Sequence, residues 1–221
     1  MILILTRLYH NSMSFLDSSL LIKAINFAAI KHKTQRRKDA AGTPYINHPI
    51  EVAYLISQIG GITDIDILRA AVLHDTLEDT ETTWEELWSL FGEVVANMVK
   101  EVTDDKSLPK DERKRLQIEH GPSLSRGARI VKLADKLSNL RDLVANPPLG
   151  WDQDRIQGYF VWSQFVVNGL RGACKPLEDA LDVVFQSVCR IHLKVFPAIP
   201  KEVNLAEVLT KYLESMKTAT N

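Results

Sequence analysis

The apolar residues of this 221-residue chain recur at the spacing of an α-helix almost from end to end. No sustained stretch alternates apolar and polar residues as a half-buried strand does, and no repeat of solenoid length is present. Hydrophobic residues make up 45% of the chain, which is enough to bury one substantial core. The sequence therefore predicts an all-α fold, a single-domain bundle of about eight to ten helices.

Capping residues and glycines place the ends of several helices. Asp17 is the expected N-cap of the first helix, which continues to about Thr34. Thr83 has the spacing of a capping box with the glutamate three residues later, and Gly92 ends the helix that Thr83 begins. Residues 175–193 are expected to form one continuous helix.

These boundaries predict three parts along the chain. Residues 1–16 are expected to be a flexible tail, residues 17–192 the domain, and residues 193–221 a C-terminal extension with a last helix from about Val203 to Met216. The apolar start, MILILTRLYHNSM, is far shorter than the roughly 20 residues of a membrane span. We therefore expect no association with a membrane.

The charge balance restricts the partners. The chain has 27 lysines and arginines against 28 aspartates and glutamates, so we expect no general attraction to nucleic acid, and an anionic ligand must meet a local basic cluster. Cys174 and Cys189 form no CxxC pair, which favours a reducing, cytoplasmic compartment over a disulfide framework. A mitochondrial address has only Arg7 as basic support near the N-terminus.

The segment AVLHDTLEDT, residues 71–80, combines an apolar helical pattern with an unusual concentration of ionisable groups. On an ideal helix, four of its side chains fall within an arc of about 140° on one face: His74, Asp75, Glu78 and Asp79. Carboxylates at these spacings repel by about 0.2–0.5 kcal/mol per pair. Because the preceding residues are too apolar for a solvated helix, we expect a divalent cation to balance this face; a solvated acidic face is the alternative.

Two residues from distant segments complete a candidate metal site. His48 directly precedes a proline that starts a helix, so its side chain is expected to project from an extended backbone. Asp135 lies on the helix face opposite a buried stripe of leucines. Two imidazoles and two carboxylates suit Mn²⁺, Fe²⁺ or a similar borderline ion, with open positions for water and a substrate oxygen. The complete predicted ligand set is His48, His74, Asp75 and Asp135.

Four separated motifs, in order, resemble the hydrolase domain of the RelA/SpoT enzymes within the HD phosphohydrolase superfamily, in particular its small stand-alone animal members. The motifs are RRKDAAGTPYINHP, AAVLHDTLEDT, EVTDDKSLPKDERKRLQ and VKLADKLSNLRDL, and the resemblance covers roughly residues 17 to 192. Four ordered motifs are far more specific than an isolated HD dipeptide. The resemblance implies an HD-domain helical bundle that binds one Mn²⁺ per chain at the four predicted ligands.

The same resemblance implies an activity, the removal of the 3′-pyrophosphate from guanosine tetra- or pentaphosphate to leave GDP or GTP. Glu78 and Asp79 match the catalytic pair of the family, and either is a candidate general base. The expected partner is a purine nucleotide with phosphate on a secondary ribose hydroxyl. The residues for which the resemblance implies substrate contacts are Arg37, Lys38, Lys110, Asn139, Arg155 and Tyr159.

Two alternatives stay open at this point. Hydrolysis of the 2′-phosphate of NADPH needs the same chemistry, since that substrate also carries phosphate on a secondary ribose hydroxyl. An inactive helical module that binds nucleotide or a protein partner belongs to another class, and the intact Glu78 and Asp79 argue against it. The stretch after His192 departs from the family pattern, which leaves the oligomeric state, a homo-oligomer included, undetermined.

Overall fold

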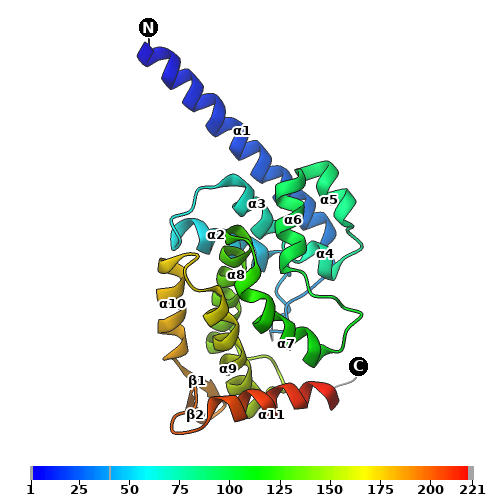
Figure 1. Cartoon of the computed structure of the whole chain (residues 1–221), viewed down its shortest axis with the longest axis vertical. Coiled ribbons are helices and arrows are strands. Elements are labelled where there is room, and N and C mark those ends of the chain that lie inside the picture. The colour runs from blue at the N-terminus through cyan, green and yellow to red at the C-terminus, as the bar shows by residue number, and fades with distance from the viewer. Residues whose placement is uncertain (1, 40, 219–221) are drawn as a thin grey trace.

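The computed structural model describes the backbone of residues 2–39 and 41–218, and the side chains of residues 17–39 and 41–217 (Figure 1). Helices dominate it, as the all-α prediction requires. In chain order the elements are α1 (Ile2–Lys31), α2 (Asn47–Gln58), α3 (Ile65–Leu73), α4 (Thr76–Asp79), α5 (Trp84–Phe91), α6 (Glu93–Val102), α7 (Lys110–His120), a 3₁₀ turn η1 (Gly121–Ser123), α8 (Arg126–Ala145), α9 (Gln153–Leu170), α10 (Lys175–Phe185), β1 (Val188–Ile191), β2 (Lys194–Pro197) and α11 (Leu205–Thr218).

Helix α8 is the central element of the bundle. It packs against α2, α3, α6, α9 and α10. Its leucine stripe is fully buried, as predicted, with Leu133, Leu137 and Leu140 at 0% exposure. Ser125 caps its first turn by accepting a hydrogen bond from the amide of Ala128. The opposite face of α8 is therefore free to present polar groups to a site.

Helix α1 differs from the expected element. It begins at Ile2, so Asp17 lies inside the helix and does not cap it. The segment before Asp17 contains neither glycine nor proline, so no residue there interrupts a helix. Ala24 and Ala28 are fully buried, whereas the N-terminal half of α1 extends away from the bundle (Figure 1). The division of the chain at residues 16 and 192 stays a prediction.

Residues 175–193 are not one helix. α10 ends at Phe185, and β1 pairs antiparallel with β2, so that Cys189 lies opposite Phe196. Both of these side chains are buried, while their strand neighbours Val188 and Val195 are exposed. Strands of four residues are too short for a period-two pattern to stand out, which explains the wrong prediction.

The acidic segment is also not one continuous helix. α3 ends at Leu73, and α4 starts at Thr76. The hydroxyl of Thr76 donates to the carbonyl of Leu73 at 2.7 Å, which competes with the helical hydrogen-bond pattern at this turn. His74 and Asp75 therefore occupy a turn between two helices. Among the described residues, no helix combines the length and the apolar character that crossing a bilayer requires.

Candidate metal centre and nucleotide site

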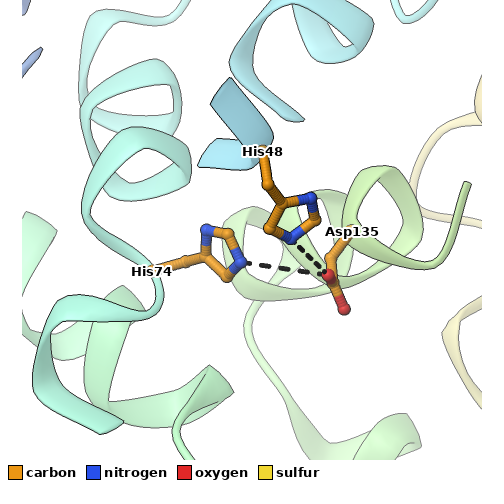
Figure 2. A group of neighbouring side chains, drawn as sticks. All are labelled: His48, His74 and Asp135. Atoms are coloured by element: carbon orange, nitrogen blue, oxygen red, sulfur yellow. Dashed lines mark hydrogen bonds and ion pairs between the residues drawn. The ribbon is translucent and has the colours of Figure 1, made fainter. Parts of the chain in front are cut away.

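Side chains from three distant segments converge at one point. His48 lies in the first turn of α2, His74 in the turn between α3 and α4, and Asp135 on the polar face of α8 (Figure 2). One ligand atom of each lies within 4.8 Å of the others. Asp135 Oδ1 is 3.1 Å from His48 Nε2 and 3.9 Å from His74 Nε2. Figure 2 shows both imidazole rings directed at this carboxylate.

Asp75 joins the same cluster from the neighbouring position in the turn. Its Oδ2 lies 2.9 Å from His74 Nε2 and 3.8 Å from His48 Nε2. None of these four side chains is more than 18% exposed. The structure therefore places Asp75 beside both histidines, next to the group of His48, His74 and Asp135, whose ligand atoms all lie within 4.8 Å of one another.

The hydrogen bonds of the two histidines show that the cluster fits a cation. His74 Nδ1 faces the carbonyl of Ala71 at 2.8 Å, so this nitrogen carries the proton and donates it. Ser138 donates its hydroxyl to Glu51, so its oxygen accepts from His48 Nδ1 at 3.0 Å. When both rings are neutral, each therefore presents its Nε2 lone pair to the cluster. His74 Nε2 is buried and faces the carboxylate oxygens of Asp75 at 2.9 Å and Asp135 at 3.9 Å, a position that either a proton or a bound cation can fill.

Two further residues orient the carboxylates, and the sequence prediction did not include them. The hydroxyl of Tyr45 donates to Asp75 Oδ2 at 2.6 Å, and the ammonium of Lys136 donates to Asp135 Oδ2 at 2.9 Å. The signal for Tyr45 was its place in the same motif as His48. The signal for Lys136 was a lysine inside a largely buried helix, which needs a carboxylate partner.

Glu78 and Asp79 lie on α4 but have different surroundings. Glu78 Oε2 accepts the amide of Asp104 at 3.1 Å, and Arg113 lies 3.9 Å from its Oε1. Burial raises the pKa of Glu78 to about 7, and the hydrogen bond from Asp104 partly opposes this. Asp79 instead forms an ion pair with Lys106, another residue that was not predicted.

A cavity of about 390 Å³ adjoins the cluster, which is the size of a small-molecule site. Two residues that line the cavity connect it to the candidate ligands. Tyr45 donates a hydrogen bond to Asp75, and Asn139 donates one to Asp135. Trp151, which was not predicted, provides an aromatic wall. The predicted residues that line the cavity are Arg37, Lys38, Asp79, Asn139 and Tyr159.

Arg37 crosses this cavity to α8. Its Nη2 donates to Asp142 Oδ2 at 2.6 Å and to Asn139 Oδ1 at 3.1 Å. An anionic ligand would have to replace Asp142 as the partner of this guanidinium. The adjacent Lys38 also lines the cavity.

Lys110 and Arg155, the two remaining predicted contacts, lie near the cavity without lining it. Arg155 stacks over the Trp151 ring, with its guanidinium carbon 4.4 Å from the ring centroid. Burial lowers the pKa of Lys110, and the positive charges of Arg155 and Lys38 lower it further. The charges of Arg155 and Lys38 therefore act on Lys110 in the folded chain.

Known proteins resemble this chain closely. The model of the HD-domain family matches residues 24–158. The chain is 59% identical over 169 residues to the guanosine-3′,5′-bis(diphosphate) 3′-pyrophosphohydrolase MESH1 of Xenopus tropicalis, covering 76% of this chain and 94% of the relative. It is 56% identical over 170 residues to the protein of the same name from Homo sapiens, covering 77% and 95%.

A solved structure leads to the same family. It is described as a metazoan ortholog of SpoT that hydrolyzes ppGpp and plays a role in starvation responses. It superposes on this chain with a TM-score of 0.74 at 51% identity, over 75% of this chain and 93% of that one. These matches confirm the resemblance that the four motifs predicted. The chain belongs to the HD-domain family and, within it, to the MESH1 proteins.

Proposed function

We propose that this protein is a metal-dependent guanosine-3′,5′-bis(diphosphate) 3′-pyrophosphohydrolase, the activity for which its relatives are named. The observation that carries the proposal is the buried cluster of His48, His74 and Asp135 beside a cavity with basic and aromatic walls. A guanosine nucleotide with two diphosphates needs both a cation for the reacting phosphate and basic groups for the others.

The four predicted ligands would hold one divalent cation per chain, for which we propose Mn²⁺ because the donors are nitrogen and oxygen. When bound, the cation supplies positive charge that polarises a phosphoryl oxygen and makes water a better nucleophile. Asp135 is kept in place by Lys136, and Asp75 by Tyr45. Lys136 binds Oδ2 of Asp135 and leaves its Oδ1 directed at the histidines, whereas Tyr45 donates to Oδ2 of Asp75, the oxygen that itself faces the histidines.

We assign the role of general base to Glu78, which lies on α4 three residues after the predicted ligand Asp75 and whose pKa burial raises to about 7, near the working pH at which a base is most effective. Asp79 lines the cavity and orients the attacking water. The aromatic rings of Trp151 and Tyr159 offer stacking surfaces for the purine. Arg37 and Lys38 neutralise phosphate charge.

The proposed activity is tested with the purified chain, Mn²⁺ and guanosine 3′,5′-bis(diphosphate). We expect release of pyrophosphate and GDP in equal amounts, identified by chromatography. No release of pyrophosphate with any divalent metal would contradict the proposal. An inactive binding module would also carry no stoichiometric transition metal when purified without chelator, so metal analysis separates these two functions.

Hydrolysis of the 2′-phosphate of NADPH remains a prediction for the same cavity, since its basic and aromatic walls suit any purine nucleotide. A parallel assay for inorganic phosphate and NADH decides it. An intracellular, reducing location also remains a proposal, which the two buried free thiols of Cys174 and Cys189 support. A homo-oligomer stays a prediction.

Arg37→Ala is expected to lower kcat/KM by about 10- to 100-fold, because it removes charge-assisted hydrogen bonds to phosphate. Steady-state kinetics with guanosine 3′,5′-bis(diphosphate) measures the effect. Arg141→Ala is the matched control, since this arginine is exposed on α8 and does not line the cavity. Equal losses of kcat/KM in the two variants would show that substrate binding depends only on the general positive charge of this surface.

Metal binding is expected to release about one proton per ion at pH 7.5. Burial alone lowers the pKa of His74, but Asp75 outweighs burial and raises this pKa to about 9 in the absence of a cation. The imidazole must be neutral to bind a cation, so metal affinity rises with pH up to about 9. Calorimetry in buffers of different ionisation enthalpy measures the proton, and a heat that is independent of the buffer would contradict this expectation.

A further inference from the structure

Helix α11 lies across the helices that carry three of the predicted substrate contacts (Figure 1). It packs chiefly against α9, with Arg155 and Tyr159, and against α7, which begins at Lys110. Tyr212 and Met216, one turn apart, form its buried inner face, at 5% and 6% exposure. The last helix is therefore part of the core and not a free appendage.

The ring of Tyr212 lies directly on Gly158. A Cβ atom at Gly158 would lie 2.5 to 2.8 Å from three atoms of Tyr212, a separation that carbon atoms do not tolerate. Only glycine permits this approach of α11 to α9. The next residue along α9 is Tyr159, which lines the cavity. The position of Tyr212 therefore sets the spacing between α11 and the turn of α9 that carries a cavity wall.

Tyr212 also contacts α7 through Lys114. The ammonium of Lys114 lies 5.5 Å from the ring centroid of Tyr212 and 5.1 Å from that of Tyr159. It is 3.4 Å from the ring centroid of Trp162, whose indole donates to the Lys114 carbonyl at 2.9 Å. Lys114 thus ties α7 to rings of both α9 and α11, and it lies one turn after Lys110.

Such packing is needed because the charges at this end of α7 and α9 repel. The pKa of Lys110 is lowered first by burial and then by the positive charges of Arg155 and Lys38, so these cations repel one another. Without a polyanion between them, electrostatics favours their separation. A site that holds these groups together before the ligand arrives avoids the cost of ordering them on binding.

We propose that Tyr212 is a positioning residue for the nucleotide site. Through Gly158 and Lys114 it holds α7 and α9 at the spacing that lets Lys110 and Arg155 act on the same ligand. This inference rests on the proposed function, because it takes the cavity to be the site of a nucleotide polyphosphate. It assigns a role in substrate binding to a helix that follows the part of the chain matched by the HD-domain family model.

Tyr212→Ala is expected to raise KM about tenfold, the equivalent of one well-placed charge-assisted contact, with kcat changed less than about twofold. The metal cluster lies on other elements, so the chemical step is little affected. Tyr212→Phe should keep the wild-type KM, because the ring makes the contacts described here. Met216→Ala is the matched control: it removes a buried side chain from the same face, so it should lower Tm and leave KM unchanged.

A double-mutant cycle tests the contact itself. Gly158→Ala should raise KM as Tyr212→Ala does, because the new methyl group pushes the ring away. In the Tyr212→Ala background the same methyl group meets empty space and should add little. Additive effects would show that the two residues act independently and would contradict the proposed contact.

Binding of a fluorescent analogue of guanosine 3′,5′-bis(diphosphate) without metal gives a measurement that does not depend on turnover. We expect Tyr212→Ala to weaken it about tenfold, in parallel with KM. A wild type that binds but does not hydrolyse would overturn the proposed function alone. The positioning role would be overturned if Tyr212→Ala bound the analogue and kept KM as the wild type does, or if Met216→Ala raised KM as much as Tyr212→Ala. A wild type that does not bind the analogue would overturn both the proposed function and the positioning role.

Discussion

Asp135→Ala is expected to lose the bound cation and turnover together. Asp135 is the carboxylate that α8 contributes to the cluster, and its Oδ1 lies 3.1 Å from His48 Nε2. Loss of a group that merely orients a ligand lowers metal affinity about 10- to 100-fold, so loss of a ligand should exceed that range. Metal content after dialysis and turnover with added Mn²⁺ measure the two effects.

Asp79→Asn is the matched comparison for this variant. Asp79 lines the cavity and is paired with Lys106, not with the cluster. We expect this variant to abolish turnover and to keep nearly all of the metal. Equal metal loss in Asp79→Asn and Asp135→Ala would contradict the division into ligands and catalytic groups.

Removal of Asp135 has a second consequence, which the experiment must separate from metal loss. Lys136 is only 4% exposed and would lose its carboxylate partner, which typically costs about 3–5 kcal/mol for a buried ion pair. The double variant Asp135→Ala, Lys136→Met removes the unpaired ammonium. It should recover stability, seen as a higher Tm, without recovering metal. Recovery of metal binding would mean that Asp135 acts only by neutralising Lys136.

Glu78→Gln is expected to lower kcat by about 10²- to 10⁴-fold, the usual contribution of a general base. In the wild type, kcat/KM should fall about tenfold per pH unit below pH 7, because a protonated Glu78 cannot accept the proton. Metal content should stay at the wild-type level. A variant with wild-type turnover, or a profile without an acidic limb, would remove Glu78 from the mechanism.

The same substitution is expected to stabilise the fold at high pH. The pKa of Glu78 is raised from 4.5 to about 7, so the folded state favours the protonated carboxyl group. The stability from this preference is fully present below pH 4.5 and is lost as pH rises through 7. The amide cannot ionise, and its oxygen can still accept the amide of Asp104. The gain from Glu78→Gln should therefore be near zero at pH 4.5 and about 2–3 kcal/mol above pH 7.

Thermal unfolding of metal-free protein at pH 5 and pH 8.5 measures this gain. At the higher pH we expect a rise in Tm of roughly 5–10 °C for a chain of this size. Glu81→Gln is the control, since Glu81 is exposed just beyond α4. A rise of the same size at both pH values would contradict the origin in the buried charge.

Features that depend on neighbours in the chain were predicted well. Thr83 and Gly92 bound α5 as expected, because the Thr83 hydroxyl accepts the amide of Glu86 and Gly92 adopts φ 88°. The all-α class followed from helical periodicity.

The break between α3 and α4 was missed, because in the sequence Thr76 looks like any other threonine in an apolar helix, although its hydroxyl bonds to the carbonyl of Leu73. The short hairpin after Phe185 was missed because its strands have only four residues each.

The sequence by itself determined the helical class and the family, and it predicted His48, His74, Asp75 and Asp135 as a ligand set, because residue chemistry and motif order are written along the chain. Only the tertiary structure decided which groups these side chains meet. Arg37 is paired with Asp142, Lys136 with Asp135, and Tyr212 lies on Gly158. Contacts between distant elements arise from the summed packing of whole helices, and no local pattern along the chain contains that information.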